Sequence, residues 1–142
     1  MGLPSPHSFS LKGFTVADNL PNVIENALLD ALVGTTAYSM TGPVMLALMT
    51  ANGNDASAGT EVTGGSYGRV SMSMTAASGG SITNSAELNF TGMPTATVVG
   101  VELYDSNGSP KRLAYGSLSV SKAVTSGDTL QFAASSVTLS LS

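Results

Sequence analysis

The stretch Val44-Met45-Leu46-Ala47-Leu48-Met49 decides the fold of this chain, because all six residues are apolar and no polar face interrupts them. A strand with apolar side chains on both faces is typical of a position between two layers. The run is strand-sized and falls far short of the ~20 apolar residues that a membrane-spanning helix needs. We therefore expect a central strand here, with structure packed on each side.

Downstream of this strand, apolar and polar residues alternate. In segment 69–75, Val70, Met72 and Met74 have polar neighbours, which is the period of a half-buried strand. Similar runs occur at 88–90, 99–103, 113–115, 130–134 and 137–141. Turn-forming segments separate the runs, at Asn52-Gly53, Ser78-Gly79-Gly80, Asn107-Gly108 and Ser126-Gly127-Asp128. The pattern predicts about seven or eight short strands in a mainly β protein, an antiparallel β-sandwich of jelly-roll-like form.

The alternation changes phase once, at Gly116-Ser117, where Leu113 and Tyr115 give way to Leu118 and Val120. A β-bulge places an extra residue in one strand and moves the following side chains to the other face. Glycine within a strand often marks such a site. We therefore expect a bulge at this point.

One amphipathic α-helix is expected near the N-terminus, at about residues 19–33. Asp18 or Asn19 could cap it, and Gly34 suits the left-handed position past its end. Its apolar residues recur at helical spacing and form one stripe: Leu20, Val23, Ile24, Ala27, Leu28, Ala31 and Leu32. We expect this stripe to cover an open face of a sheet, within a single β-sandwich domain over residues 18–142.

Residues 1–17 are expected to form an extended N-terminal arm. Pro4 and Pro6 disfavour a helix, and the segment 8–11 alternates polar with apolar residues. Apolar side chains in an arm need a surface to cover them. We predict that four of them contact a partner protein: Leu3, Phe9, Leu11 and Phe14.

The composition favours protein partners over nucleic acid or membrane. Charged residues make up only 10% of the 142 residues, hydrophobic residues 42%, and the net charge is −4. The five basic residues are scattered, so no basic stripe could neutralise a phosphate backbone. An exterior of Ser, Thr, Asn and Gly loses little side-chain entropy when protein covers it, although this composition is also ordinary for a β protein. We expect no nucleic-acid and no membrane partner.

The chain offers few groups for catalysis. His7 is the only histidine and cysteine is absent, so neither a Ser-His-Asp site nor a Cys/His metal site can be assembled. Segments 52–55 and 105–108 resemble cation loops but lack the bidentate glutamate of a calcium loop, so we interpret them as turns. Five carboxylates could still meet in space to hydrolyse a glycoside or bind Ca²⁺: Glu61, Glu87, Glu102, Asp105 and Asp128. We expect no catalytic residue, no metal, no cofactor and no enzymatic activity.

Several segments, taken in order, carry a resemblance to a known family. The helix end at 27–34 and the strand at 44–50 precede Thr60-Glu61-Val62-Thr63-Gly64-Gly65-Ser66-Tyr67-Gly68-Arg69, and segments 86–90 and 126–134 follow. Over roughly residues 20–142 the chain resembles a family of small tailed-phage virion proteins, variously labelled tail fibre, minor structural or head decoration protein. It departs from the family pattern by lacking a tryptophan in the middle strands and by carrying Pro110-Lys111-Arg112 after a hairpin.

The resemblance implies a structural protein of the virion, assembled in the host cytoplasm. We expect a capsid decoration (cement) protein that binds the outer shell as a homotrimer, with the major capsid protein or other virion proteins as partners. Many weak contacts repeated over a shell would supply the affinity. The alternative is a tail fibre or minor tail protein that contacts the host surface, where four tyrosines could stack on sugars: Tyr38, Tyr67, Tyr104 and Tyr115.

Overall fold

The computed structural model describes residues 8–11, 14–17 and 20–141, with side chains from residue 20 onward. The protein is mainly β, as predicted, with one short helix. The elements in chain order are β1 (Ser8–Leu11), β2 (Phe14–Ala17), α1 (Asn22–Leu32), β3 (Val44–Ala51), β4 (Thr60–Glu61), β5 (Val70–Met72), β6 (Ser81–Thr83), β7 (Leu88–Phe90), β8 (Ala96–Tyr104), β9 (Arg112–Val124), β10 (Thr129–Phe132) and β11 (Val137–Ser140).

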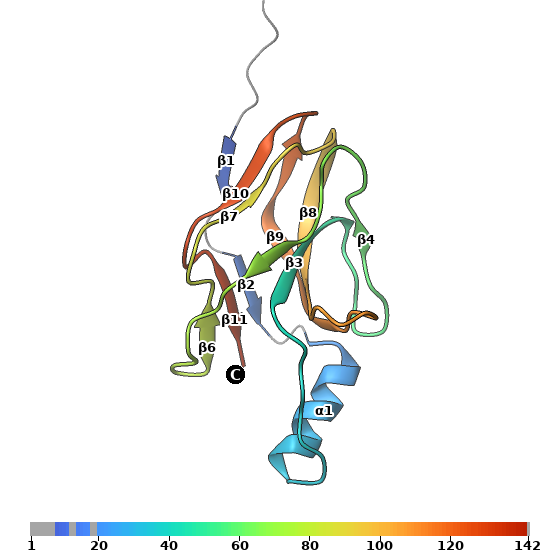
Figure 1. Ribbon diagram of the computed structural model, residues 1–142, viewed down its shortest axis with the longest axis vertical. Coiled ribbons are helices and arrows are strands. Elements are labelled where there is room, and N and C mark those ends of the chain that lie inside the picture. The colour runs from blue at the N-terminus through green and yellow to red at the C-terminus, as the bar shows by residue number, and fades with distance from the viewer. Residues whose placement is uncertain (1–7, 12–13, 18–19, 142) are drawn as a thin grey trace, which may run out of the picture.

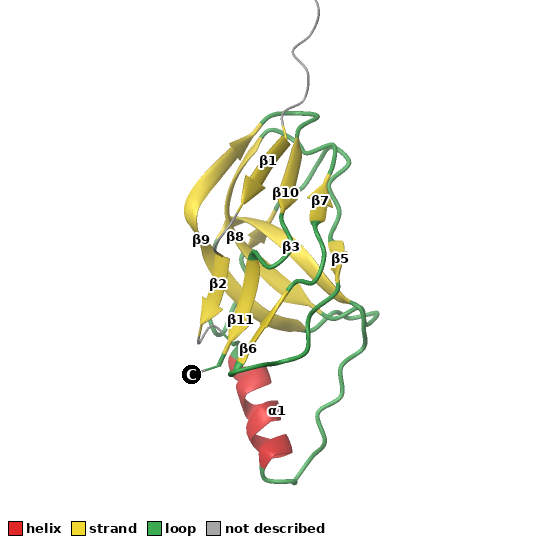
Figure 2. Ribbon diagram, turned by 90° about the vertical axis from the view of Figure 1, so that its left-hand side faces the viewer, coloured by secondary structure: helices red, strands yellow, loops and turns green. Residues whose placement is uncertain are grey.

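Two layers form the sandwich. One is the antiparallel sheet β4-β3-β8-β9, in which β5 also pairs with β3. The other is divided into two three-stranded sheets, β1-β10-β7 and β2-β11-β6, which lie end to end (Figure 2). The antiparallel sandwich is therefore confirmed. Two parallel pairs, β1 with β10 and β2 with β11, were not expected from the sequence.

Strand β3 is central and buried on both faces, as its apolar run predicts. Leu46 and Leu48 face the main core between the layers, together with Phe90 and Phe132. Ala47 and Met49 face the opposite side of the sheet and are equally buried there, in a small cluster with Tyr104. Some further structure must cover this second face, and a loop supplies that cover.

Asn84 joins the two halves of the divided layer. Its buried side chain donates to the carbonyl oxygens of Ala86 at 2.8 Å and Ala133 at 2.9 Å, and accepts from the N–H of Val137 at 2.8 Å. One amide therefore satisfies backbone groups at the point where the strand ladders stop. Buried backbone groups without partners would be costly there.

The bulge predicted at Gly116-Ser117 is confirmed in the pairing of β8 with β9. Gly100 pairs with Ser117, whereas Val98, two residues earlier, pairs with Lys122. Strand β9 therefore carries extra residues directly after Ser117, as in a bulge.

The expected placement of the helix is wrong, although the helix itself is present. Helix α1 hangs from one end of the sandwich (Figure 1) and covers no sheet face. Only Ile24 within it is buried, whereas Val23 and Leu32 of the predicted stripe are exposed. The two layers already cover each other, so they leave only their end for a helix to pack against. The N-cap is Pro21, with no side-chain cap, in place of the predicted Asp18 or Asn19, which lie outside the described residues.

The segment predicted as an arm contributes strands where it is described. Strands β1 and β2 have extended backbone and pair with β10 and β11 of the same chain. Residues 1–7 lie outside the described residues. Within the described ranges, no helix is long and apolar enough to cross a membrane.

Candidate functional site

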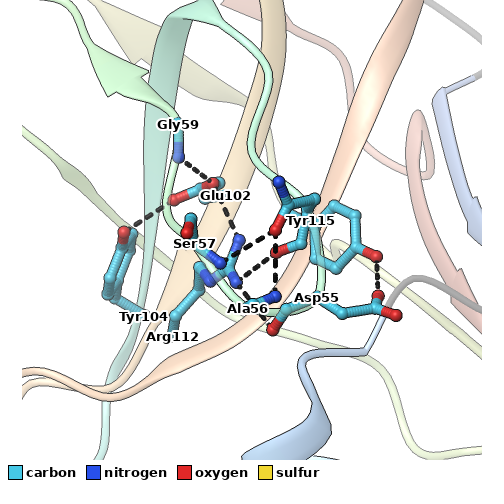
Figure 3. Close-up of polar contacts among 9 residues, drawn as sticks. Asp55, Ala56, Ser57, Gly59, Glu102, Tyr104, Arg112 and Tyr115 are labelled. Atoms are coloured by element: carbon cyan, nitrogen blue, oxygen red, sulfur yellow. Dashed lines mark hydrogen bonds and ion pairs between the residues drawn. The ribbon is translucent and has the colours of Figure 1, made fainter.

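The loop between β3 and β4 folds back over the second face of the β3-β8-β9 sheet (Figure 3). At its far end the Gly59 N–H donates to the Glu102 carboxylate at 2.8 Å. Glu102 lies on β8 and is fully buried. Its other oxygen accepts from the Tyr104 hydroxyl at 2.6 Å. The loop thus closes over a buried carboxylate that the strand alone would expose.

Arg112, at the start of β9, supplies the opposite charge. Its guanidinium lies 3.2 Å from Glu102 and also donates to the carbonyl oxygens of Asn54 and Asp55 in the loop. The Tyr115 hydroxyl donates to the Asp55 carboxylate at the loop edge. A buried ion pair is tolerated only when hydrogen bonds satisfy its remaining groups, and this pair has them. The cluster therefore fixes the loop on the sheet.

A second cluster assembles the residues that carry the family resemblance. Arg69 binds Glu61 through two hydrogen bonds, at 3.0 and 2.8 Å. The Tyr67 hydroxyl donates to Glu61 at 2.9 Å and accepts from the Leu48 N–H of β3 at 2.9 Å. Between them, Gly64 and Gly65 have positive φ values of 105° and 57°, which residues with a Cβ rarely adopt. The motif therefore fastens β4 and its following loop to β3.

Tyr104 connects the two clusters across the sheet. The Arg69 guanidinium carbon lies 3.8 Å from the centre of the Tyr104 ring, a cation–π contact. The hydroxyl of the same tyrosine reaches Glu102. The ion pair of Glu61 with Arg69 and the ion pair of Glu102 with Arg112 are therefore joined through the ring and hydroxyl of Tyr104.

The pKa values follow from these contacts. Burial raises the pKa of the Tyr104 phenol, and its bond to Glu102 raises it further. Burial likewise raises the pKa of Tyr67, as does the negative charge of Glu61. For Glu61, burial acts to raise the pKa, but the hydrogen bonds from Arg69 and Tyr67 outweigh it and lower the pKa. At neutral pH the cluster therefore holds ionised Glu61 beside neutral tyrosines.

The five carboxylates that could have formed a catalytic or Ca²⁺ site instead make hydrogen bonds and ion pairs within the protein. Glu61 and Glu102 each pair with an arginine. Asp105 accepts from the Lys111 N–H at 2.7 Å, Asp128 from the Thr125 N–H at 2.8 Å, and Glu87 from the Asn89 amide at 2.8 Å. Among the described residues, no three acidic or histidine side chains gather in a group that could hold a metal ion.

Both candidate cation loops form turns closed by their own side chains. The side-chain Oδ1 of Asn54 accepts from the N–H groups of Ala56 and Ser57, each at 3.0 Å. In the other loop, Asp105 accepts from the Asn107 N–H at 3.3 Å. These are the local bonds by which Asn and Asp stabilise turns.

Of the four tyrosines that could stack on sugars, Tyr67 and Tyr104 pack their rings against other side chains of the protein. The Tyr67 ring stacks on Phe90, with centroids 6.0 Å apart and an interplanar angle of 12°. Tyr104 is buried beneath Arg69. Tyr38 and Tyr115 are half-buried. The four rings therefore do not form one open stacking surface.

The predicted contact residues divide into two groups. Leu3 lies outside the described residues. The backbone of Phe9 and Leu11 pairs opposite Leu130 and Phe132, and that of Phe14 opposite Val137. These three therefore belong to strands of the sandwich, and their contact with a partner stays a prediction.

An apolar surface at the α1 end was missed by the sequence reasoning. Val23, Leu29, Leu32 and Val33 are 57%, 60%, 81% and 71% exposed. Beside the helix lies an open apolar groove of about 200 Å³. The signal was present in the sequence: Leu29 and Val33 fall outside the single stripe, so one buried face could not have covered all the apolar residues.

Comparison with known protein families finds a match. The family model described as Podophage GP4 fiber I protein gp80 matches residues 19–140, which is most of the chain. No curated protein matches the sequence significantly. The matched range begins just before α1 and includes both charged clusters.

Proposed function

Because this chain belongs to the podophage fibre I protein gp80 family and is therefore a structural protein of a phage virion, we propose that it acts there without catalysis, as a fibre component that binds other virion proteins through its α1 end. The family description names a fibre, which supports the tail-fibre alternative over capsid decoration. Capsid decoration, the homotrimer and binding to the major capsid protein stay predictions.

The observation that carries this proposal is the exposure of large apolar side chains on α1. Leu29, Leu32 and Val33 face solvent near one another at the end of the molecule, on and directly after one helix. Exposed apolar patches of this kind mark protein contacts. Burying one leucine side chain fully contributes about 1.5–3 kcal/mol, so two or three such residues supply a modest interface. Repetition along a fibre raises the overall affinity.

The charged clusters support the same proposal because their groups are already engaged in contacts within the protein. The buried carboxylate Glu102 already binds three donors, and Glu61 is held by Arg69 and Tyr67. Groups engaged in this way act by fixing the loops and strands that carry them. The stabilised sandwich then serves as a rigid support for the α1 end.

Incorporation into virions tests the proposal. A phage that lacks its own copy is complemented with the double variant Leu29→Ser, Leu32→Ser, and the protein in purified particles is quantified by mass spectrometry. We expect at least a tenfold loss of incorporation, with a normal melting temperature. The matched control is Val120→Ser on β9, where an equally exposed apolar residue lies outside α1. Wild-type incorporation of the double variant would contradict the proposal.

Copy number and immunolabelling separate the two virion locations. A fibre component is expected at a few copies per particle, with antibody label at the tail in electron micrographs. A decoration protein would be present at the copy number of the shell and would label the head.

A further inference from the structure

The groove beside α1 is an open apolar hollow that none of the described residues covers. Its volume is about 200 Å³, and an apolar cavity of about 150 Å³ is large enough for a benzene molecule. A second hollow of about 210 Å³ continues it and shares Ile82, Leu139 and Leu141. Residues from α1, from the segment after it and from β6 and β11 form the lining, among them Leu28, Tyr38, Met40, Ile82, Leu139 and Leu141. The groove can therefore accept one or two apolar side chains.

The position of Ser8 shows which chain segment could fill the groove. Strand β1 lies at the end of the sandwich opposite α1 (Figure 1). Strands β1 and β2 follow each other along the divided layer, beside β10 and β11 (Figure 2). At about 3.3 Å per residue, a chain running straight from Ser8 to Ala17 at the α1 end spans roughly 30 Å. Residues 1–7 reach at most about 25 Å. Leu3 lies only five residues before Ser8 and reaches at most about 18 Å, so it falls short of the groove of its own chain.

A second copy stacked end to end removes this restriction. Its residues 1–7 would leave its β1 end beside the α1 end of the first copy. We propose that residues 1–7 of one copy, with Leu3 as the principal contact, occupy the apolar groove of the next copy and join the copies head to tail.

The chemistry of the segment matches the groove. Residues 1–7 include Met1, Leu3, Pro4 and Pro6, and contain no Asp, Glu, Lys or Arg. The groove lining is apolar, so a charged segment would lose its hydration without gaining a partner. The prolines restrict φ, which lowers the entropy lost on docking. An interface between two different surfaces of identical chains is heterologous and extends into a ring or a filament.

Complementation between two variants tests this arrangement. Leu3→Lys disables the donor segment, and Leu141→Lys disables the groove at a side chain that is 56% exposed, so the charge is tolerated by the single copy. The control is Val120→Lys, an exposed apolar residue on β9 that does not line the groove. Sedimentation velocity over a concentration series measures association, and thermal melting confirms that each variant is folded.

We expect the wild type and Val120→Lys to form assemblies of increasing size as concentration rises. Each of the other variants alone should associate at least tenfold more weakly. An equimolar mixture of Leu3→Lys with Leu141→Lys should form dimers and stop there, because it retains one working donor and one working groove. No interface that pairs groove with groove produces this result.

Three outcomes would overturn the inference. They are a wild type that stays monomeric at the highest concentration, a Leu3→Lys variant that associates like the wild type, and a mixture that remains monomeric. The second outcome would point to α1 or another face of a second copy as the occupant. These measurements concern purified protein alone, so their result is independent of incorporation of the α1 variants into virions.

Discussion

The region under the loop between β3 and β4 and the region at the α1 end differ in which residues they bury. Beneath the loop between β3 and β4, the protein buries charge and satisfies it completely: Glu102 accepts from a backbone N–H, a phenol and a guanidinium. At the α1 end it exposes apolar side chains and leaves a groove open. The first region is complete within one chain. The second leaves apolar surface open, which under the proposed function another protein covers, so the comparison separates internal stability from assembly.

The largest expected effect comes from breaking the first region at Glu102. Replacement by alanine leaves Arg112 buried without its counter-ion and removes the acceptor for Gly59. Removing one partner of a buried ion pair costs about 3–5 kcal/mol. We expect urea denaturation to show a loss of this size in the free energy of unfolding. The control is Glu87→Ala, an exposed carboxylate whose loss should change stability by less than about 0.5 kcal/mol. Equal effects of the two variants would refute the structural role of the cluster.

A smaller effect is expected from acid acting on Glu61. Its pKa is lowered in the folded protein, from a usual value of 4.5, so ionised Glu61 stabilises the fold at neutral pH. This contribution is fully present above about pH 4.5 and is lost as pH falls below that value through the folded pKa. In Glu61→Gln, we expect roughly 1 kcal/mol lower stability at pH 7 and a shallower decline between pH 5 and 3. Melting temperatures measured across this range provide the test, and parallel curves for both proteins would count against it.

The smallest expected effect on stability lies at the α1 end. Leu32→Ser removes a side chain that is 81% exposed and has little to lose in contacts with its own chain. We expect a change within about 0.5 kcal/mol in urea denaturation. Ile24→Ala, one face away on the same helix but buried, should cost at least about 2 kcal/mol and serves as the contrast. Similar losses for both would mean that Leu32 packs within its own chain.

Local pattern determined much of the fold. The alternation of Leu46 and Leu48 with Ala47 and Met49 predicted a strand buried on both faces, and each pair indeed faces its own core. The phase change at Gly116-Ser117 predicted the bulge. These features depend on neighbouring residues along a single strand, which periodicity records.

Features that depend on distant residues could not be predicted in this way. The contacts of Glu102 with Gly59 and Arg112 join three separate segments, and no periodicity links them. The Glu61-Tyr67-Arg69 cluster was visible only as a family motif, without its geometry. The position of α1 was predicted wrongly because amphipathicity shows that a helix has a face to bury but not which surface receives it.

The parallel pairing of β1 with β10 has a consequence for the order in which the chain can fold. Ser8 pairs with Thr129, so this ladder joins segments that are synthesised far apart in time. The β8-β9 hairpin, by contrast, connects neighbouring segments and can form early. On the ribosome, β1 must wait without its partner until β10 has been made. Strand β1 therefore gains its partner only after β10 has been synthesised, which delays any attachment that requires the complete sandwich.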